Sequence, residues 1–120
     1  MLGHITPALL TYNEEQNIRR TLSRLMWAED IVVVDSGSTD RTLTIVSDYP
    51  NVRVFNRRFD THDKQWRYAV EETKIATEWI LRLDADYQVS DALVSECRRR
   101  YCDAQRPGLF MTIANRWRNW

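Results

Sequence analysis

Short apolar runs recur at regular intervals along the chain, and each is the length of a single β-strand. The run at residues 31–34 is β-branched throughout, which is typical of a strand buried on both faces of a sheet. Pro7 lies near the start of the first run, where a missing backbone donor is tolerated. Strands are predicted over residues 5–12, 31–34, 52–55 and 79–83.

Between these runs, apolar residues recur three and four positions apart, as on one face of a helix. The first helix is predicted to begin at Asn13, because Gln16 completes a capping-box-like pair three residues later. Its predicted apolar face consists of Ile18, Leu22, Leu25 and Met26. Three further helices are predicted: one around Leu43 and Val46 that ends at Pro50, one over residues 63–77 and one over residues 90–101.

The alternation of strands and helices predicts an α/β domain. Its sheet is mostly parallel, with helices on both faces and right-handed crossovers. Ligands of such sheets bind beyond the carboxyl ends of the strands. Polar clusters follow the four strands, at residues 11–14, 35–40, 56–60 and 84–86. The candidate chemistry is therefore expected at one rim of the sheet.

Length and composition are those of one soluble globular domain: 120 residues, 43% hydrophobic and 28% charged. A formal net charge of zero argues against a dedicated nucleic-acid binder. The chain has no apolar run long enough to span a bilayer and no signal-peptide pattern at its start, so we expect a cytoplasmic protein. Cys97 and Cys102 form no metal-binding pattern, and reduced thiols are expected.

The charge is distributed unevenly, and this divides the chain into residues 1–96 and a basic tail, 97–120. The tail carries six arginines against one acid, Asp103, and the first part is correspondingly acidic. A basic segment with tryptophans can contact anionic lipid, which would place the protein peripherally at the inner face of the membrane, or it can contact another protein. The alternative is a poorly ordered terminus.

Asp84 and Asp86 follow the last predicted strand directly. If that strand continues, residues i and i+2 point to the same side, so that both carboxylates can converge on one cation. Hard divalent ions such as Mg²⁺ commonly bind one or two carboxylates together with phosphate oxygens. The alternative is that one aspartate caps the next helix and the other is a solvated turn residue.

Two other carboxylate motifs fit poorly. An EF-hand loop counted from Asp84 would need Gly and Glu where the chain has Val89 and Ser95. A haloacid dehalogenase-type phosphatase would carry its nucleophile after the first strand, and Gln88 stands where Thr or Val is expected.

Asp35 ends the most buried predicted strand and precedes a turn of small residues around Gly37. Its carboxylate can accept a hydrogen bond from a base N–H or a ribose hydroxyl. The alternative is a plain turn in which Ser38 or Thr39 caps the following helix.

Three blocks of residues together resemble glycosyltransferase family 2, the inverting enzymes with a GT-A fold. The blocks are residues 11–15 (TYNEE), 33–40 (VVDSGSTD) and 83–86 (LDAD). The resemblance covers roughly residues 5 to 96 and includes the segment 57–60 (RRFD). It implies that residues 1–96 form a nucleotide-sugar-binding, Rossmann-like GT-A half-domain.

The resemblance also implies roles for individual residues. Asp86 would be the main metal ligand, for Mg²⁺ or Mn²⁺, and Asp84 would lie near the ribose or the metal. Arg57 or Arg58 would approach the donor's phosphates, with surface solvation as the alternative. The donor would be a nucleotide-sugar, with a UDP-sugar favoured, and the acceptor a saccharide or a lipid-linked molecule. The base pocket would be lined by Thr11, Tyr12, Asn13 and Glu14, with Asp35 contacting the base.

The chain departs from the family in two respects. Arg67 stands where many relatives have Asn, and only about 34 residues follow Asp86, where the family has its acceptor half and catalytic base. We therefore assign no catalytic base and expect a truncated domain with weak or no transfer activity alone. The alternative is a non-catalytic nucleotide-binding or partner-docking module. A third possibility, a nucleotidyltransferase, fits poorly, because it would carry a Gly- and Arg-rich loop after its first strand. Residues 11–16 are not such a loop.

Overall fold

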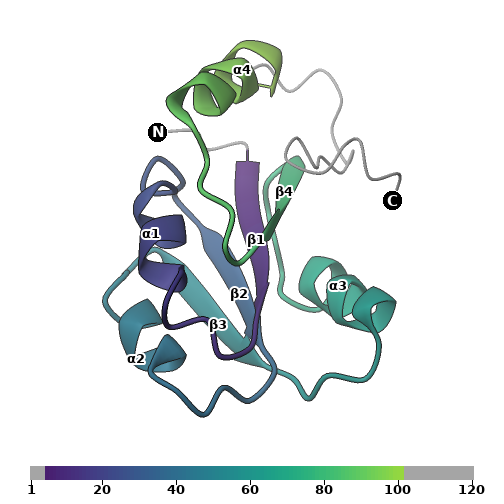
Figure 1. The fold of residues 1–120 in the computed structure, drawn as a ribbon. Helices are drawn as coiled ribbons and strands as arrows, with labels where there is room; N and C mark the ends of the chain where they lie inside the picture. The colour runs from purple at the N-terminus through teal and green to yellow at the C-terminus, as the bar shows by residue number, and fades with distance from the viewer. Residues whose placement is uncertain (1–4, 102–120) are drawn as a thin grey trace.

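Four parallel strands form one sheet in the order β3-β2-β1-β4. The computed structural model describes residues 5–101, and the side chains of residues 5–97 (Figure 1). The strands are close to the predicted ones, each shifted by one residue at most at its carboxyl end. Their bounds are β1 (Ile5–Thr11), β2 (Ile31–Asp35), β3 (Val52–Asn56) and β4 (Trp79–Asp84).

Helices cover both faces of the sheet, which confirms the predicted α/β class (Figure 1). α1 and α2 lie on one face and α3 on the other. α4 packs on the α1–α2 side, because its Cys97 belongs to the same buried cluster as Leu22 of α1. The bounds are α1 (Ile18–Ser23), α2 (Thr42–Val46), α3 (His62–Glu71) and α4 (Asp91–Tyr101).

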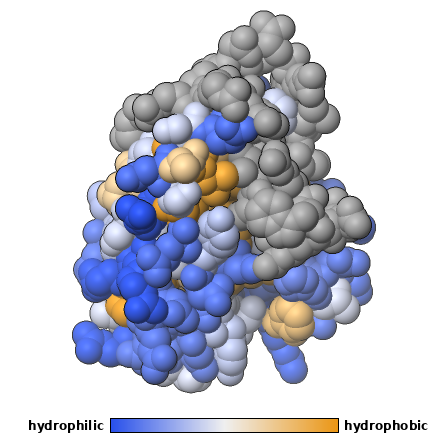
Figure 2. Space-filling view, turned by 45° about the horizontal axis from the view of Figure 1, so that its top comes forward, coloured by the Kyte–Doolittle hydropathy of each residue, from blue (hydrophilic) through white to orange (hydrophobic). Residues whose placement is uncertain are grey.

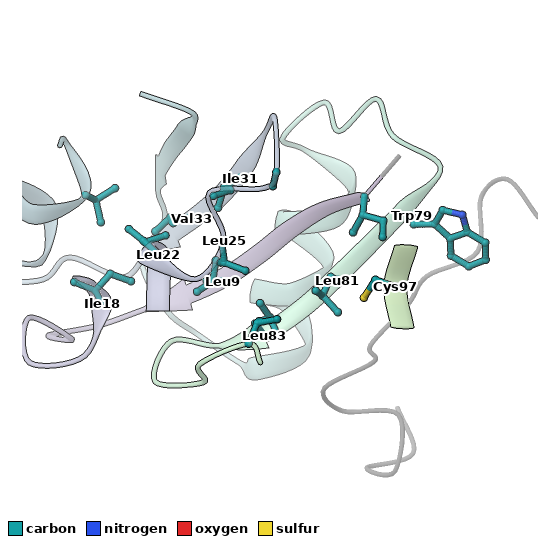
Figure 3. Packing of buried hydrophobic residues seen from close by; sticks show 14 residues of the cluster. Leu9, Ile18, Leu22, Leu25, Ile31, Val33, Trp79, Leu81, Leu83 and Cys97 are labelled. Atoms are coloured by element: carbon teal, nitrogen blue, oxygen red, sulfur yellow. The ribbon is translucent and has the colours of Figure 1, made fainter. Parts of the chain in front are cut away.

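The core is divided by the sheet into two hydrophobic clusters. The larger one lies on the α1–α2 side, where Leu9, Leu81 and Leu83 of the sheet meet Leu22 (Figure 3). The smaller one lies under α3. It consists of Ala8, Val32, Val34, Trp66, Ala69 and Ile80. Residues alternate between the two clusters along each strand, as strand geometry requires.

The register brings the carboxyl ends of all four strands to one rim. Thr11 pairs with Asp35, Asp35 pairs with Asn56, and Leu10 pairs with Asp84. From β1 the chain moves outward to β2 and β3, and then returns to the other side of β1 as β4. In such sheets the crevice at this reversal, here between β1 and β4, is the usual ligand-binding position.

The first helix does not begin at Asn13, so that prediction was wrong. Asn13 has φ +51°, a left-handed conformation that ends the strand and excludes a helix start. α1 begins at Ile18 and ends at Ser23. Because the helix stops there, Met26 loses the predicted helical phase and is 46% exposed, whereas Ile18, Leu22 and Leu25 are buried as expected.

Two other helix ends also differ from prediction. α3 stops at Glu71 instead of continuing to 77: the Thr73 hydroxyl donates to the carbonyl of Ala69 (2.6 Å), and Lys74 has φ +56°. α2 ends at Val46, four residues before Pro50. A turn follows α2, and bends and irregular backbone follow α3, in place of the last predicted helical residues.

Away from the grey atoms, the face of the molecule shown in Figure 2 is mainly hydrophilic. Within residues 5–101, no helix has the length and apolar character needed to cross a bilayer. The division at residue 97 falls inside α4, whose Cys97 is a buried free thiol. Cys102 and residues 102–120, with the predicted lipid contact of the basic tail, lie outside the described residues.

Candidate functional site

Asp35 is the most completely hydrogen-bonded side chain of the rim. Its carboxylate is fully buried and accepts four bonds, all between 2.6 and 2.9 Å. The donors are the Thr11 hydroxyl, the Gly37 and Ser38 amides and the Ser38 hydroxyl. A carboxylate has about four acceptor positions, so these bonds use its capacity. Asp35 therefore fixes the shape of the loop 36–40, and its contact with a base stays a prediction.

The alternative interpretation of this loop, a helix cap from Ser38 or Thr39, is wrong. The N-cap of α2 is Arg41, and it makes no side-chain capping bond. Asp40 takes over part of that function, because its Oδ1 accepts from the amide (2.9 Å) and the hydroxyl (2.5 Å) of Thr42. These bonds hold the pKa of the Asp40 carboxyl below its usual value, against the opposing effect of its desolvation.

The loop after β1 is joined to the loop after β2. The Asn13 side-chain oxygen accepts from the Thr39 amide (2.8 Å), and the Asn13 amide donates to the Ser38 hydroxyl (2.8 Å). The Glu14 amide donates to the Thr42 hydroxyl (2.8 Å). Tyr12, by contrast, is 57% exposed at the rim. Of the predicted base-pocket residues, Asn13 thus joins the two loops, and Tyr12 presents a free aromatic ring.

We had expected Asp84 and Asp86 to point to the same side of a continuing strand, but the strand does not continue to Asp86. β4 ends at Asp84, and the Tyr87 amide donates to the Asp84 carbonyl (3.0 Å), so that residues 84–87 form a turn. Asp86 is exposed in this turn, and Asp84 is half-buried. Neither caps α4, because the Ser90 hydroxyl accepts from the Leu93 amide at its start (3.0 Å).

The two carboxylates lie in different electrostatic surroundings. Glu14 is close enough to Asp86 and Asp40 for both to raise its pKa, in addition to the larger effect of burial. Asp84 instead lies near Arg82. In the part of the chain that the structure describes, no group of three or more His, Cys, Asp or Glu side chains could hold a metal ion. A cation at Asp86 would need ligand oxygens from water and phosphate, as Mg²⁺ commonly has.

Arg57 is held on the α3 side of the rim. Its Nη1 donates to Asp60 Oδ1 (3.0 Å) and Gln65 Oε1 (2.7 Å), and its guanidinium carbon lies 5.6 Å from the centre of the Tyr68 ring. Arg57 follows β3 and Asp86 follows β4, and these are the two outer strands. Three strand spacings amount to roughly 14 Å, so a diphosphate held by a cation at Asp86 would lie far from Arg57.

The Arg57–Asp60 pair gives a direct test of this geometry. The pKa of the Asp60 carboxyl is lowered from 3.8 to about 2, and the hydrogen bond from Arg57 is the largest cause. We expect Arg57→Gln to return the pKa toward its usual value, as measured by the side-chain carboxyl shift of Asp60 in an NMR pH titration. An Asp60 titration that is the same in Arg57→Gln and the parent chain would show that the two side chains are not paired.

Two residues of the site were missed by the sequence interpretation. Gln65 is buried and its amide donates to the Ser36 hydroxyl (3.1 Å) and the Arg57 carbonyl (3.0 Å), which ties α3 to the loops after β2 and β3. Arg82 lies in β4 with its guanidinium carbon 4.2 Å from the centre of the Trp66 ring. Burial lowers the pKa of Arg82 to about 10, although Asp63 and Asp84 oppose this. For Arg82, the signal available in the sequence was a charged residue within an otherwise apolar strand.

Comparison with known proteins identifies the family of the chain. The family model "Glycosyl transferase family 2" matches residues 8–116. An uncharacterized glycosyltransferase of Rickettsia bellii is 32% identical over 77% of this chain and 31% of its own length. The lipopolysaccharide core biosynthesis glycosyltransferase LpsC of Rhizobium meliloti is 29% identical over 71% of this chain and 32% of its own length.

Solved structures show the same fold. A crystal structure of S. aureus TarS (residues 1–349) superimposes with a TM-score of 0.68 and 25% identity, over 79% of this chain and 31% of that one. The chain thus spans about a third of the length of the relatives that it matches. From the family match over most of its residues and the parallel sheet that it shares with TarS, the chain belongs to glycosyl transferase family 2 and has the GT-A fold.

Proposed function

We propose that this domain binds a nucleotide-sugar donor, preferably a UDP-sugar, together with Mg²⁺ or Mn²⁺ at the crevice between β1 and β4, for inverting glycosyl transfer. Asp86 is the main cation ligand. The observation that carries the proposal is the position of Asp86: it is exposed in the turn after β4, at this crevice, and after burial its charge is the largest cause that raises the pKa of half-buried Glu14.

The residues fit a hard divalent cation. The raised pKa of Glu14 reflects, after burial, the repulsion from Asp86 and Asp40. A bound cation would relieve that repulsion, and the donor's phosphates would complete its coordination. When bound, such a metal stabilises the departing diphosphate as a Lewis acid. Asp86, in an exposed turn, is open to the cation from the solvent side.

The remaining rim residues form the base and ribose side of the site. Tyr12 offers its exposed ring to the base, next to the hydrogen-bonded loops after β1 and β2. Asp84 accepts from a ribose hydroxyl or joins Asp86 at the cation. Asp35 and Asp84 end the two strands that flank β1, about 10 Å apart across two strand spacings, so that one nucleotide can reach from Asp84 to the loop that Asp35 holds. The acceptor is a saccharide or a lipid-linked molecule.

Calorimetric titration of UDP into the full 120-residue chain, with and without Mn²⁺, tests the proposal. We expect Mn²⁺ to strengthen UDP binding in the parent chain. Asp86→Ala should weaken binding in Mn²⁺ by at least tenfold, about 1.4 kcal/mol, and have little effect without the metal. The reason is that the variant loses a charged cation ligand and keeps the base pocket.

Asp48→Ala is the matched control, because it removes the same charge from an exposed position paired with Arg19. It should leave UDP affinity unchanged in both conditions. If Asp86→Ala binds UDP in Mn²⁺ as tightly as the parent chain, Asp86 is not the cation ligand. If Mn²⁺ does not affect the parent chain, the metal-dependent donor site is refuted.

A further inference from the structure

A hollow of about 330 Å³ opens on the exposed side of α3, against the loop after β3. Its residue Arg57 follows β3, whereas the proposed cation site follows β4, at the opposite edge of the sheet. The volume is at the lower end of the range of small-molecule sites, roughly 300 to 1,000 Å³, and suits one sugar unit with a charged substituent. The hollow is lined by Arg57, Lys64, Arg67, Tyr68, Glu71 and Glu72.

One wall of the hollow is fixed in place by other contacts. Arg57 is bonded to Asp60 and Gln65, as described above, and Gln65 is itself buried. Tyr68 is half-buried, with its ring edge-to-face against Phe55 (centroids 6.5 Å apart, 74° between planes). A cation and an aromatic ring that are already held in position lose little conformational freedom when a ligand binds.

The other lining side chains are not engaged. Among the residues that the structure describes, the Lys64, Arg67, Glu71 and Glu72 side chains make no hydrogen bond and no ion pair within 4 Å, and all four are exposed. Lys64, Arg67 and Glu71 lie three and four residues apart and so share one side of the helix, and Glu72 follows as the C-cap residue.

The order of these charges opposes helix stability. Lys64 is in the first turn of α3 and Glu71 is its last residue. A helix is favoured by acids at its amino end and bases at its carboxyl end, which is the reverse arrangement. Asp63 in the first turn has the favourable order, but the helix dipole does not account for Lys64 beside it. Lys64 and Arg67 lie in the first and second turns of α3, toward the end of the helix that follows Arg57.

We propose that this α3 hollow binds a phosphorylated saccharide. The anionic group lies among Arg57, Lys64 and Arg67, for which guanidinium and ammonium donors are suited. The apolar face of the sugar packs on Tyr68, and Glu71 and Glu72 accept from its hydroxyls at the other end. The identification of this ligand as part of the acceptor rests on the proposed transferase function. The binding of a phosphorylated saccharide to the hollow does not depend on that function.

NMR titration of the ¹⁵N-labelled 120-residue chain with glucose 6-phosphate tests the inference. We expect saturable shifts of the backbone amides of residues 64–72 with a dissociation constant in the millimolar range. Lys64→Glu/Arg67→Glu should weaken this binding at least tenfold, and Tyr68→Leu about threefold or more. Arg20→Glu/Arg24→Glu makes the same charge change in α1 and at its C-cap, across the sheet, and should change the affinity less than twofold.

Three further titrations decide between the sources of any response. Glucose should bind much more weakly than its phosphate, because it lacks the anion. If inorganic phosphate binds as tightly as glucose 6-phosphate, the hollow only attracts anions, and the saccharide site is refuted. It is also refuted if UDP alone shifts residues 64–72 to the same extent, because the hollow then belongs to the donor, or if no saturable shift occurs up to roughly 10 mM ligand.

The donor site can be judged separately. Lys64→Glu/Arg67→Glu should keep the Mn²⁺-dependent UDP affinity of the parent chain. Failure of UDP to bind the parent chain would refute the proposed donor site and leave the α3 hollow untouched. If the parent chain binds UDP but not glucose 6-phosphate, the α3 hollow is refuted as a saccharide site and the donor site is kept.

Discussion

Asp35→Ala is expected to lower the free energy of unfolding by about 4 kcal/mol. The substitution removes a buried carboxylate that accepts from Thr11, Gly37 and Ser38. The two hydroxyls can turn toward other acceptors, but the Gly37 and Ser38 amides have fixed directions and lose their partner. Both bonds are partly buried, and a buried donor left unpaired costs about 1 to 3 kcal/mol, more when its partner was charged. Urea unfolding followed by tryptophan fluorescence measures the effect.

The matched control is Asp48→Ala, which removes an exposed carboxylate and should cause no measurable loss of stability. Asp35→Asn keeps one acceptor oxygen and should fall between Asp35→Ala and the parent chain. A loss below about 1 kcal/mol for Asp35→Ala would contradict the structural role. If Asp35→Asn instead kept its stability and lost UDP binding, Asp35 would act mainly on the ligand.

Trp66→Ala should lower the free energy of unfolding by a similar amount, about 3 to 5 kcal/mol. Trp66 is 6% exposed and fills the smaller cluster under α3. The guanidinium of Arg82 stacks on the Trp66 ring. Arg82 pairs with Ala8 of β1, and the small side chain of Ala8 leaves room for the indole. The variant would create a cavity and leave Arg82 partly buried without its stacking partner. The measurement is again urea unfolding.

A double-mutant cycle separates the two contributions of Trp66. Arg82→Met in the Trp66→Leu background should show a coupling of about 1 kcal/mol relative to the single variants, the size of a cation–π contact. Tyr12→Ala, which removes an exposed aromatic side chain, should leave stability unchanged. Additive effects of Trp66→Leu and Arg82→Met would show that the stacking contributes nothing.

The strands were predicted well because their signal is local. A continuous β-branched run at 31–34 cannot be exposed on either side, and β2 is buried at all five positions. The short loops that follow the strands were equally clear, which is why Thr11, Asp35 and Asp84 were found as rim residues. Their common rim followed from parallel pairing, and the register confirms it.

The helix boundaries failed where distant contacts set the backbone. Asn13 is a residue type that often begins a helix. In the structure its backbone has φ +51°, and its side-chain oxygen accepts hydrogen bonds from the amides of residues 39 and 40. α3 was predicted six residues too long, because Lys74 adopts a left-handed conformation that its residue type does not favour. The capping signal at Asn13 cannot show that the backbone of residues 39 and 40 will bind its side chain instead.

Local patterns were enough to predict the α/β class, the four strands and the polar residues at their carboxyl ends, because periodicity and turn chemistry act between near neighbours. Four features could be seen only in the folded chain: the strand order, the four hydrogen bonds to Asp35, the turning of Arg57 toward α3 and the stacking of Arg82 on Trp66. The strand order, the bond from Thr11 to Asp35 and the stacking of Arg82 on Trp66 join segments that lie far apart in the chain, so they depend on how whole elements pack. The bonds of Asp35 to Gly37 and Ser38, and of Arg57 to Gln65, are nearer in sequence, but the residue types do not specify them in advance.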